Sequence, residues 1–164
     1  MLKRHPRVAI LWHGDRETRQ NATAENNKFR QVFEAFAHDN FLAEPAVYHD
    51  AFADEVRRQL REVDGVLVWV NPLQDDMNRT ILDDLLREVA SRGVFVSTHP
   101  DTILKMGTKE VLFQTRVMGW GGDIHLYKRR EDFRQHFPAR LANGSSRVLK
   151  QNRGNNGIGV WRVE

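Results

Sequence analysis

Lys150 and the glycine-rich stretch that follows it are the residues of this chain best suited to chemistry. Gly154, Gly157 and Gly159 follow the lysine at close spacing. Glycine lets the backbone adopt positive φ, and it lets amide N–H groups approach a ligand closely. A cluster of such amides beside a lysine ammonium favours phosphate oxygens as the bound group.

The residues on either side of the glycines indicate what kind of loop they form. Residues 148–149 and 160–163 are rich in β-formers, which predicts two strands. The loop is therefore expected to join two strands as a flap, whereas dinucleotide and Walker loops run from a strand into a helix. An ordinary surface hairpin loop rich in Asn and Gly is the alternative.

The stretch from Arg147 to Glu164 resembles the ATP-grasp superfamily. In that superfamily a lysine at the end of one strand precedes a flexible glycine-rich hairpin that closes over ATP, and Lys150 fits this place. The nucleotide-binding domain also begins with a lysine at the start of a helix, and Lys105 is the matching position. The resemblance implies these nucleotide-binding residues: Lys105, Lys150, Gly154, Asn155, Asn156, Gly157 and Gly159. The alternative for both lysines is a solvated surface side chain.

The resemblance also implies a reaction class, the ATP-dependent carboxylate–amine/thiol ligases. ATP and Mg²⁺ are the expected cofactors, and an unknown small carboxylate is the expected substrate. In the superfamily, the adenine-binding hinge and the Mg²⁺ ligands lie further along than the last residue here, Glu164. The chain is therefore expected to be the N-terminal part of an ATP-grasp protein, with neither a catalytic residue nor a metal ligand of its own.

Four polar residues each follow a predicted strand in the first part of the chain: His13, His49, Asn71 and His99. The carboxyl ends of parallel strands line the ligand crevice of an open sheet. These residues could therefore form a substrate rim, or they could be loop residues that cap helices or face water. A histidine metal site is a weaker hypothesis because no close i, i+4 or His-x-His pair exists.

Residues 1–100 alternate strand and helix. Strands are predicted at 8–12, 43–48, 65–70 and 94–97, with helices from residue 23 or 24, over 52–63 and over 78–90. Residues 16–21 are predicted to be a loop, and Ile81 is predicted to be buried. The pattern indicates an α/β fold, a Rossmann-like parallel sheet with helices on both faces. The resemblance makes this the domain that precedes an ATP-grasp domain.

From residue 101 the pattern changes. Helices are predicted over 109–118, with Leu112 facing inward, and over 130–140, and a short strand over 124–127 precedes the closing hairpin. Residues 101–164 are thus expected to form an incomplete α+β small subdomain of the ATP-grasp fold. Two hairpin strands with open edges are marginally stable unless more sheet joins them.

Composition narrows the function classes. The chain has no cysteine, which excludes a disulfide framework and a thiolate metal site. No apolar run is long enough to span a bilayer, so a cytoplasmic protein without a membrane partner is expected. The net charge is +3, from 25 basic and 22 acidic side chains. This excess, taken as spread along the chain, makes nucleic acid an improbable partner.

Two other hypotheses stand beside the ligase. The first is a non-catalytic nucleotide- or metabolite-binding module whose sheet edge at Trp161 pairs with a partner chain or a second copy. The second is a basic protein that binds nucleic acid.

Overall fold

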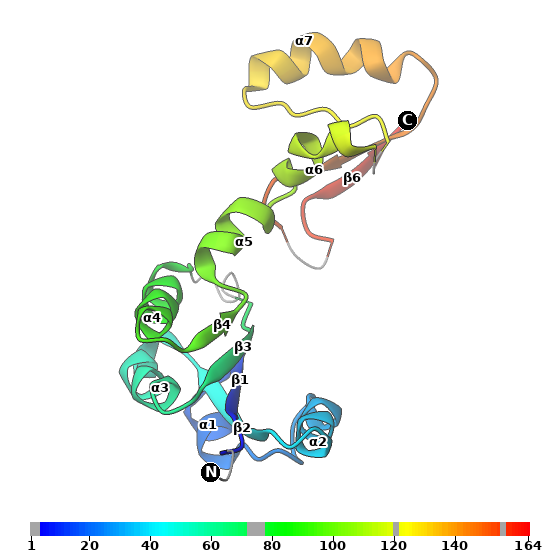
Figure 1. Cartoon of the computed structure of the whole chain (residues 1–164). Coiled ribbons are helices and arrows are strands. Elements are labelled where there is room, and N and C mark those ends of the chain that lie inside the picture. The colour runs from blue at the N-terminus through cyan, green and yellow to red at the C-terminus, as the bar shows by residue number, and fades with distance from the viewer. Residues whose placement is uncertain (1–3, 72–77, 120–121, 155–156) are drawn as a thin grey trace. The chain divides into compact units, whose positions relative to one another are not determined.

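The computed structural model describes residues 4–71, 78–119, 122–154 and 157–164. Its internal contacts divide the chain into two units, Met1–Pro100 and Asp101–Glu164. Figure 1 shows the elements of both units.

The first unit is built on a sheet of four parallel strands in the order β2–β1–β3–β4. Their bounds are β1 Arg7–His13, β2 Leu42–Tyr48, β3 Gly65–Trp69 and β4 Phe95–Ser97. Val8 of β1 pairs with Ala43 on one side and with Gly65 on the other. The prediction of a parallel α/β sheet flanked by helices is confirmed.

Helices cover both faces of this sheet (Figure 1). Helices α3 (Ala53–Leu60) and α4 (Thr80–Ser91) pack on one face, where Leu85 and Val66 are fully buried. Helix α2 (Arg30–His38) packs on the other face, where Phe33 contacts the cluster around Ile10. Each helix carries one apolar stripe because its apolar residues recur at helical spacing. A short 3₁₀ turn, η1 (Asp50–Phe52), leads into α3.

Three local predictions in the first unit are wrong. Residues 16–21 form helix α1 (Arg16–Asn21), because the Asp15 carboxylate accepts a hydrogen bond from the Thr18 N–H at 2.8 Å and caps its first turn. Helix α2 begins at Arg30, because Thr23 and Asn27 bind nearby backbone groups and hold the preceding residues in turns. Ile81 is 43% exposed, since it lies beside the apolar stripe of α4.

The described residues of the second unit form four helical segments and one hairpin. The segments are α5 (Pro100–Met106), α6 (Glu110–Gln114), the 3₁₀ turn η3 (Arg116–Met118) and α7 (Arg130–Leu141). Strands β5 (Arg147–Lys150) and β6 (Val160–Val163) pair antiparallel, with Leu149 opposite Trp161. Among the described residues this sheet has two strands only.

The predicted helix over 109–118 is divided into α6 and η3, and Leu112 is 44% exposed rather than inward. The predicted strand over 124–127 is wrong, because these residues pair with no strand in the described part of the chain. None of the described residues from 101 to 164 is buried. No described helix combines the length and the apolar composition that crossing a bilayer needs.

Candidate functional site

The sheet of the first unit brings two of the predicted rim residues together. His13 ends β1 and His49 follows β2, and their ring centroids lie 5.5 Å apart. In the sheet, β1 lies between β2 and β3. The connection that leads from the end of β2 to the start of β3 therefore crosses β1. Such a switch in strand order leaves a crevice at the carboxyl ends, where open α/β sheets bind ligands.

Hydrogen bonds orient this histidine pair. The His49 Nδ1 accepts from the Ala51 N–H at 3.1 Å, which assigns the proton of the neutral ring to Nε2. The His13 Nε2 is buried and has no hydrogen-bond partner among the described residues. The Thr18 N–H lowers the pKa of the Asp15 carboxyl.

The other two rim residues lie at the same edge of the sheet. Asn71 follows β3 and His99 follows β4, and both are partly buried. All four residues therefore lie at the carboxyl ends of the strands, and the ring contact joins His13 to His49.

A cavity of about 490 Å³ in the first unit is lined by α1, β2 and α3. Arg16 and Arg19 both reach Glu55, at 2.7 and 3.6 Å, and both guanidinium groups lie over the Phe52 ring. The Arg16 hydrogen bond lowers the pKa of the Glu55 carboxyl. One carboxylate offsets one of the two guanidinium charges, so the lining of this cavity keeps a net charge of +1.

The second unit holds a larger cavity of about 690 Å³. Its walls come from α6, the segment 123–130, α7 and the β5–β6 hairpin. The volume lies within the range of small-molecule sites. Its apolar lining includes Phe113, Tyr127, Phe133 and Trp161.

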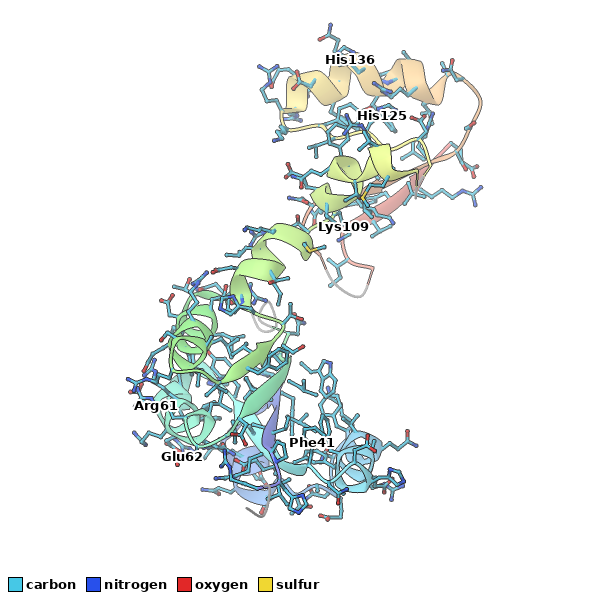
Figure 2. The ribbon with its side chains drawn as sticks, viewed as in Figure 1. Phe41, Arg61, Glu62, Lys109, His125 and His136 are labelled. Atoms are coloured by element: carbon cyan, nitrogen blue, oxygen red, sulfur yellow. The ribbon has the colours of Figure 1, made fainter. Side chains whose placement is uncertain are left out.

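Lys150 and Lys109 both line this cavity. The Lys109 ammonium donates to the Gly154 carbonyl at 3.1 Å, and the Lys109 backbone N–H donates to the Asn152 carbonyl at 3.0 Å. Figure 2 shows Lys109 at the start of α6. These bonds fasten the glycine turn to α6, while the Lys150 ammonium has no ion pair or hydrogen bond to any described residue.

Lys105 occupies a different place. It lies in the last turn of α5 rather than at the start of a helix, it is exposed, and it is not one of the cavity-lining residues. Lys109, at the first turn of α6, takes the helix-start position that the sequence assigns to Lys105.

The glycine turn leads from β5 directly into β6, as the strand-to-strand flap predicts. Gly157 and Gly159 have φ of +80° and +70°, a region that favours glycine. The Gln151 N–H donates to the Gly159 carbonyl at 2.8 Å and closes the base of the turn. Asn155 and Asn156 lie outside the described residues.

The cavity lining carries an excess of positive charge. Six cationic side chains and two carboxylates line it, a net charge of +4 with histidine neutral. Both carboxylates are engaged: Glu110 lies 3.3 Å from Lys128, and Asp123 accepts from Arg147 at 2.7 Å. The Arg147 hydrogen bond lowers the pKa of the Asp123 carboxyl, so it stays ionised.

The cationic lining of this cavity favours an anion. No three His, Asp or Glu side chains in the described ranges gather as metal ligands. The two carboxylates of the cavity also face cations, which would oppose a divalent ion.

Several lining residues were not identified from the sequence as site residues. Asp123, His125 and Tyr127 alternate along one segment, and Arg147 opens β5. The Asp-x-His-x-Tyr spacing was the available signal, since alternate residues of an extended chain share a face.

Comparison with protein-family models, with curated proteins and with solved structures gave no match to this chain.

Proposed function

We propose that the second unit binds a nucleoside triphosphate, ATP, as the N-terminal part of an ATP-grasp protein of the carboxylate–amine/thiol ligase class. One observation supports this more than any other. Lys150 ends β5 on the wall of a cationic cavity, and the glycine turn after it returns into an antiparallel strand. A loop that joins two strands and closes over phosphates needs this arrangement of lysine and glycine turn.

In this proposal the residues of the chain bind and shield the phosphates. The Lys150 ammonium, which has no partner among the described residues, neutralises phosphate charge, and amides of the turn at Gly154, Gly157 and Gly159 donate to phosphate oxygens. Lys109 holds the turn through the Gly154 carbonyl until the nucleotide arrives. The aromatic lining offers Trp161 and Phe113 as stacking surfaces for the base.

Mg²⁺ would be held by groups outside this chain, since the cavity carboxylates already face cations. An unknown small carboxylate is the substrate, and His13 and His49 are the residues that would meet it in the first unit. The proposal places the protein in the cytoplasm, where ATP is abundant.

Thermal shift of the full chain with and without millimolar Mg-ATP tests nucleotide binding. The wild type should melt at a higher temperature with nucleotide, because ligand binding to the folded state stabilises it. Lys150→Ala should remove this rise. Arg134→Ala is the matched control, because Arg134 is exposed on α7 and does not line the cavity. No rise in the wild type would end the proposal.

Two further variants distinguish the lysines. Lys109→Ala should weaken the nucleotide effect, since Lys109 lines the cavity and holds Gly154. If Lys105→Ala weakens it equally, the helix-start lysine of the ATP-grasp pattern is Lys105 and α5 must approach the nucleotide. If only Lys109→Ala weakens the nucleotide effect, Lys109 takes the place of the helix-start lysine in the ATP-grasp pattern.

A non-catalytic module that pairs with a partner chain is the second candidate function. The second unit has no buried residue among those described, and β5 and β6 pair only with each other there. Trp161 of β6 is 52% exposed. Sedimentation analysis over a range of concentrations tests pairing with a second copy: self-association that Trp161→Ser removes would support it, and a monomer throughout would leave a different chain as the partner.

A further inference from the structure

A polar cluster of four side chains joins three elements of the second unit, and we call it the Asp123 cluster: Asp123, His125, Arg140 and Arg147. Arg147 of β5 donates to Asp123 at 2.7 Å. The His125 Nε2 lies 2.5 Å from the Asp123 Oδ1 and 2.5 Å from the Arg140 Nη1. Figure 2 shows His125 on the segment that passes beneath α7, which carries Arg140.

The Asp123 cluster has too few negative charges. Asp123 is its one carboxylate, and it faces Arg147 and His125, while the Arg140 side chain contacts the His125 ring and no carboxylate among the described residues. The side chains of Arg147 and His125 are only 22% and 28% exposed. Partly buried charge is costly unless it is paired, so the cluster lacks one anion.

His125 cannot satisfy both of its neighbours. A neutral Nε2 either accepts from Arg140 or donates to Asp123, and a protonated ring can only donate. One of the two contacts is therefore always mismatched. An added acceptor beside Arg140 would remove this conflict, because Arg140 would no longer depend on the ring nitrogen.

The same region contains three buried donors without an acceptor among the described residues: the Arg140 Nε–H, the Arg147 Nε–H and the Tyr127 hydroxyl. Tyr127 lies two residues beyond His125, and its ring meets Phe133 and Phe137 of α7 with centroids at 5.3 and 6.5 Å. Arg140 is one helical turn beyond Phe137. Tyr127 and His125 therefore both face α7, on the side that carries Arg140.

We propose that Tyr127, Arg140 and Arg147 bind a small oxyanion, a carboxylate or a phosphate group, with His125 beside it. Such a group supplies the missing negative charge and several acceptor oxygens at once. Guanidinium forks match carboxylate and phosphate geometry. His125, Tyr127 and Arg147 line the cavity, which gives the ion a route to them. Lys150 lines the same cavity, but it is not among the proposed ligands of the ion, and the proposal does not require nucleotide binding.

Tyr127→Phe is the most informative variant. It keeps the ring that packs on Phe133 and removes only the hydroxyl, which has no acceptor. Without ligand the melting temperature should stay equal or rise, because a buried unsatisfied donor is lost. Binding of inorganic phosphate or acetate, measured by calorimetry on the full chain, should weaken by about tenfold or more, as expected for one hydrogen bond to a charged group.

Arg147→Gln and Arg134→Gln form a matched pair, because both remove one positive charge from the second unit and only Arg147 belongs to the Asp123 cluster. Binding should fail in Arg147→Gln and persist in Arg134→Gln at constant ionic strength. Acetate binding identifies a carboxylate site, and phosphate binding without acetate binding identifies a phosphate site.

Three results would overturn the proposal. The first is a wild type that binds neither ion. The second is a Tyr127→Phe variant that binds as tightly as the wild type. The third is phosphate binding that Lys150→Ala removes and Tyr127→Phe does not, which would assign the ion to the nucleotide site. Failure of ATP binding alone would leave this oxyanion site in place, since the calorimetry uses phosphate and acetate.

Discussion

Arg79 and Asp83 form the best-buried ion pair in the part of the chain that the structure describes. Their side chains are 15% and 7% exposed, and two hydrogen bonds of 2.7 and 3.1 Å join them one turn apart on α4. We expect Arg79→Met to lower the unfolding free energy by about 3–5 kcal/mol, because Asp83 would remain buried without a partner.

The double variant Arg79→Met, Asp83→Leu should recover most of this loss, since it leaves no buried charge. Arg30→Met on α2 is the control. Arg30 pairs with the exposed Glu34 one turn away at 3.4 Å, so its loss should cost only about 0–1 kcal/mol. Urea unfolding of the full chain measures all three. A double variant as unstable as Arg79→Met would show that the cost is lost packing rather than an unpaired charge.

Because of Tyr48, we expect the free energy of unfolding to fall as the pH becomes alkaline. Its side chain is buried in the core, and burial raises the pKa of its hydroxyl far above the ordinary value, with the hydrogen bond to Asp50 acting in the same direction. The unfolded chain loses this proton near pH 10 while the folded chain keeps it. Stability should therefore fall above about pH 10, by about 1.4 kcal/mol per pH unit.

Denaturant unfolding between about pH 9 and 11 checks this, with Tyr48→Phe expected to remove the tyrosine part of the slope. The chain has two tyrosines, so Tyr48 is the only one in the Tyr127→Phe variant. Tyrosinate absorbance in that variant should rise only as the protein unfolds. A rise while the chain is still folded would contradict the predicted direction.

Single residues were predictable from the sequence where one local rule decides. Gly93 follows α4 with φ of +92°, as a helix C-cap requires. The position of His13 and His49 after two strands was also predictable, but the contact between their rings was not, because the sequence does not give the order of the strands in the sheet. The Asp123 cluster was not predictable, because Arg140 and Arg147 reach it from separate elements and no spacing in the sequence records that contact.

Elements with a strong apolar period were also predictable. Residues Val56, Leu60 and Leu85 recur at helical spacing, and they are buried on α3 and α4. Helix α1 was missed because it buries no residue, so only the Asp15 cap indicates it. The strand over 124–127 failed for another reason: a strand needs a partner, and an alternating sequence does not supply one.

Helix α7 contains Pro138 in its interior. Proline has no N–H, so the Arg134 carbonyl loses its helical hydrogen bond, and the ring crowds that carbonyl. We expect Pro138→Ala to stabilise α7 by about 1–3 kcal/mol. Hydrogen exchange of the α7 amides in the full chain measures the local opening. Ala139→Gly is the neighbouring control and should destabilise α7 by about 1 kcal/mol; equal protection in both variants would contradict this.

Charge and core are divided unequally over the chain. Residues 101–164 carry 12 basic and 6 acidic side chains, a net charge of +6, and residues 1–100 carry 13 and 16, a net charge of −3. The expectation that the basic excess is spread along the chain is therefore wrong. The buried apolar side chains of the described residues all lie in the first unit. The second unit thus has the positive net charge and the larger of the two described cavities, and the first has the buried apolar core.

Two leucine variants test how the core is divided. Leu85 of α4 is fully buried and Leu112 of α6 is 44% exposed. Leu85→Ala should lower the unfolding free energy of the full chain by about 2–5 kcal/mol, and Leu112→Ala by less than about 1 kcal/mol. Urea unfolding measures the loss of stability in both variants, which make the same change from leucine to alanine.

Hydrogen exchange gives a second measurement. The α4 amides should open only with global unfolding, and the α6 amides should open at a lower free energy, because local stability follows buried apolar contact. A loss at Leu112 as large as at Leu85 would mean that another surface covers α6 in solution, which would favour the paired module over the isolated chain.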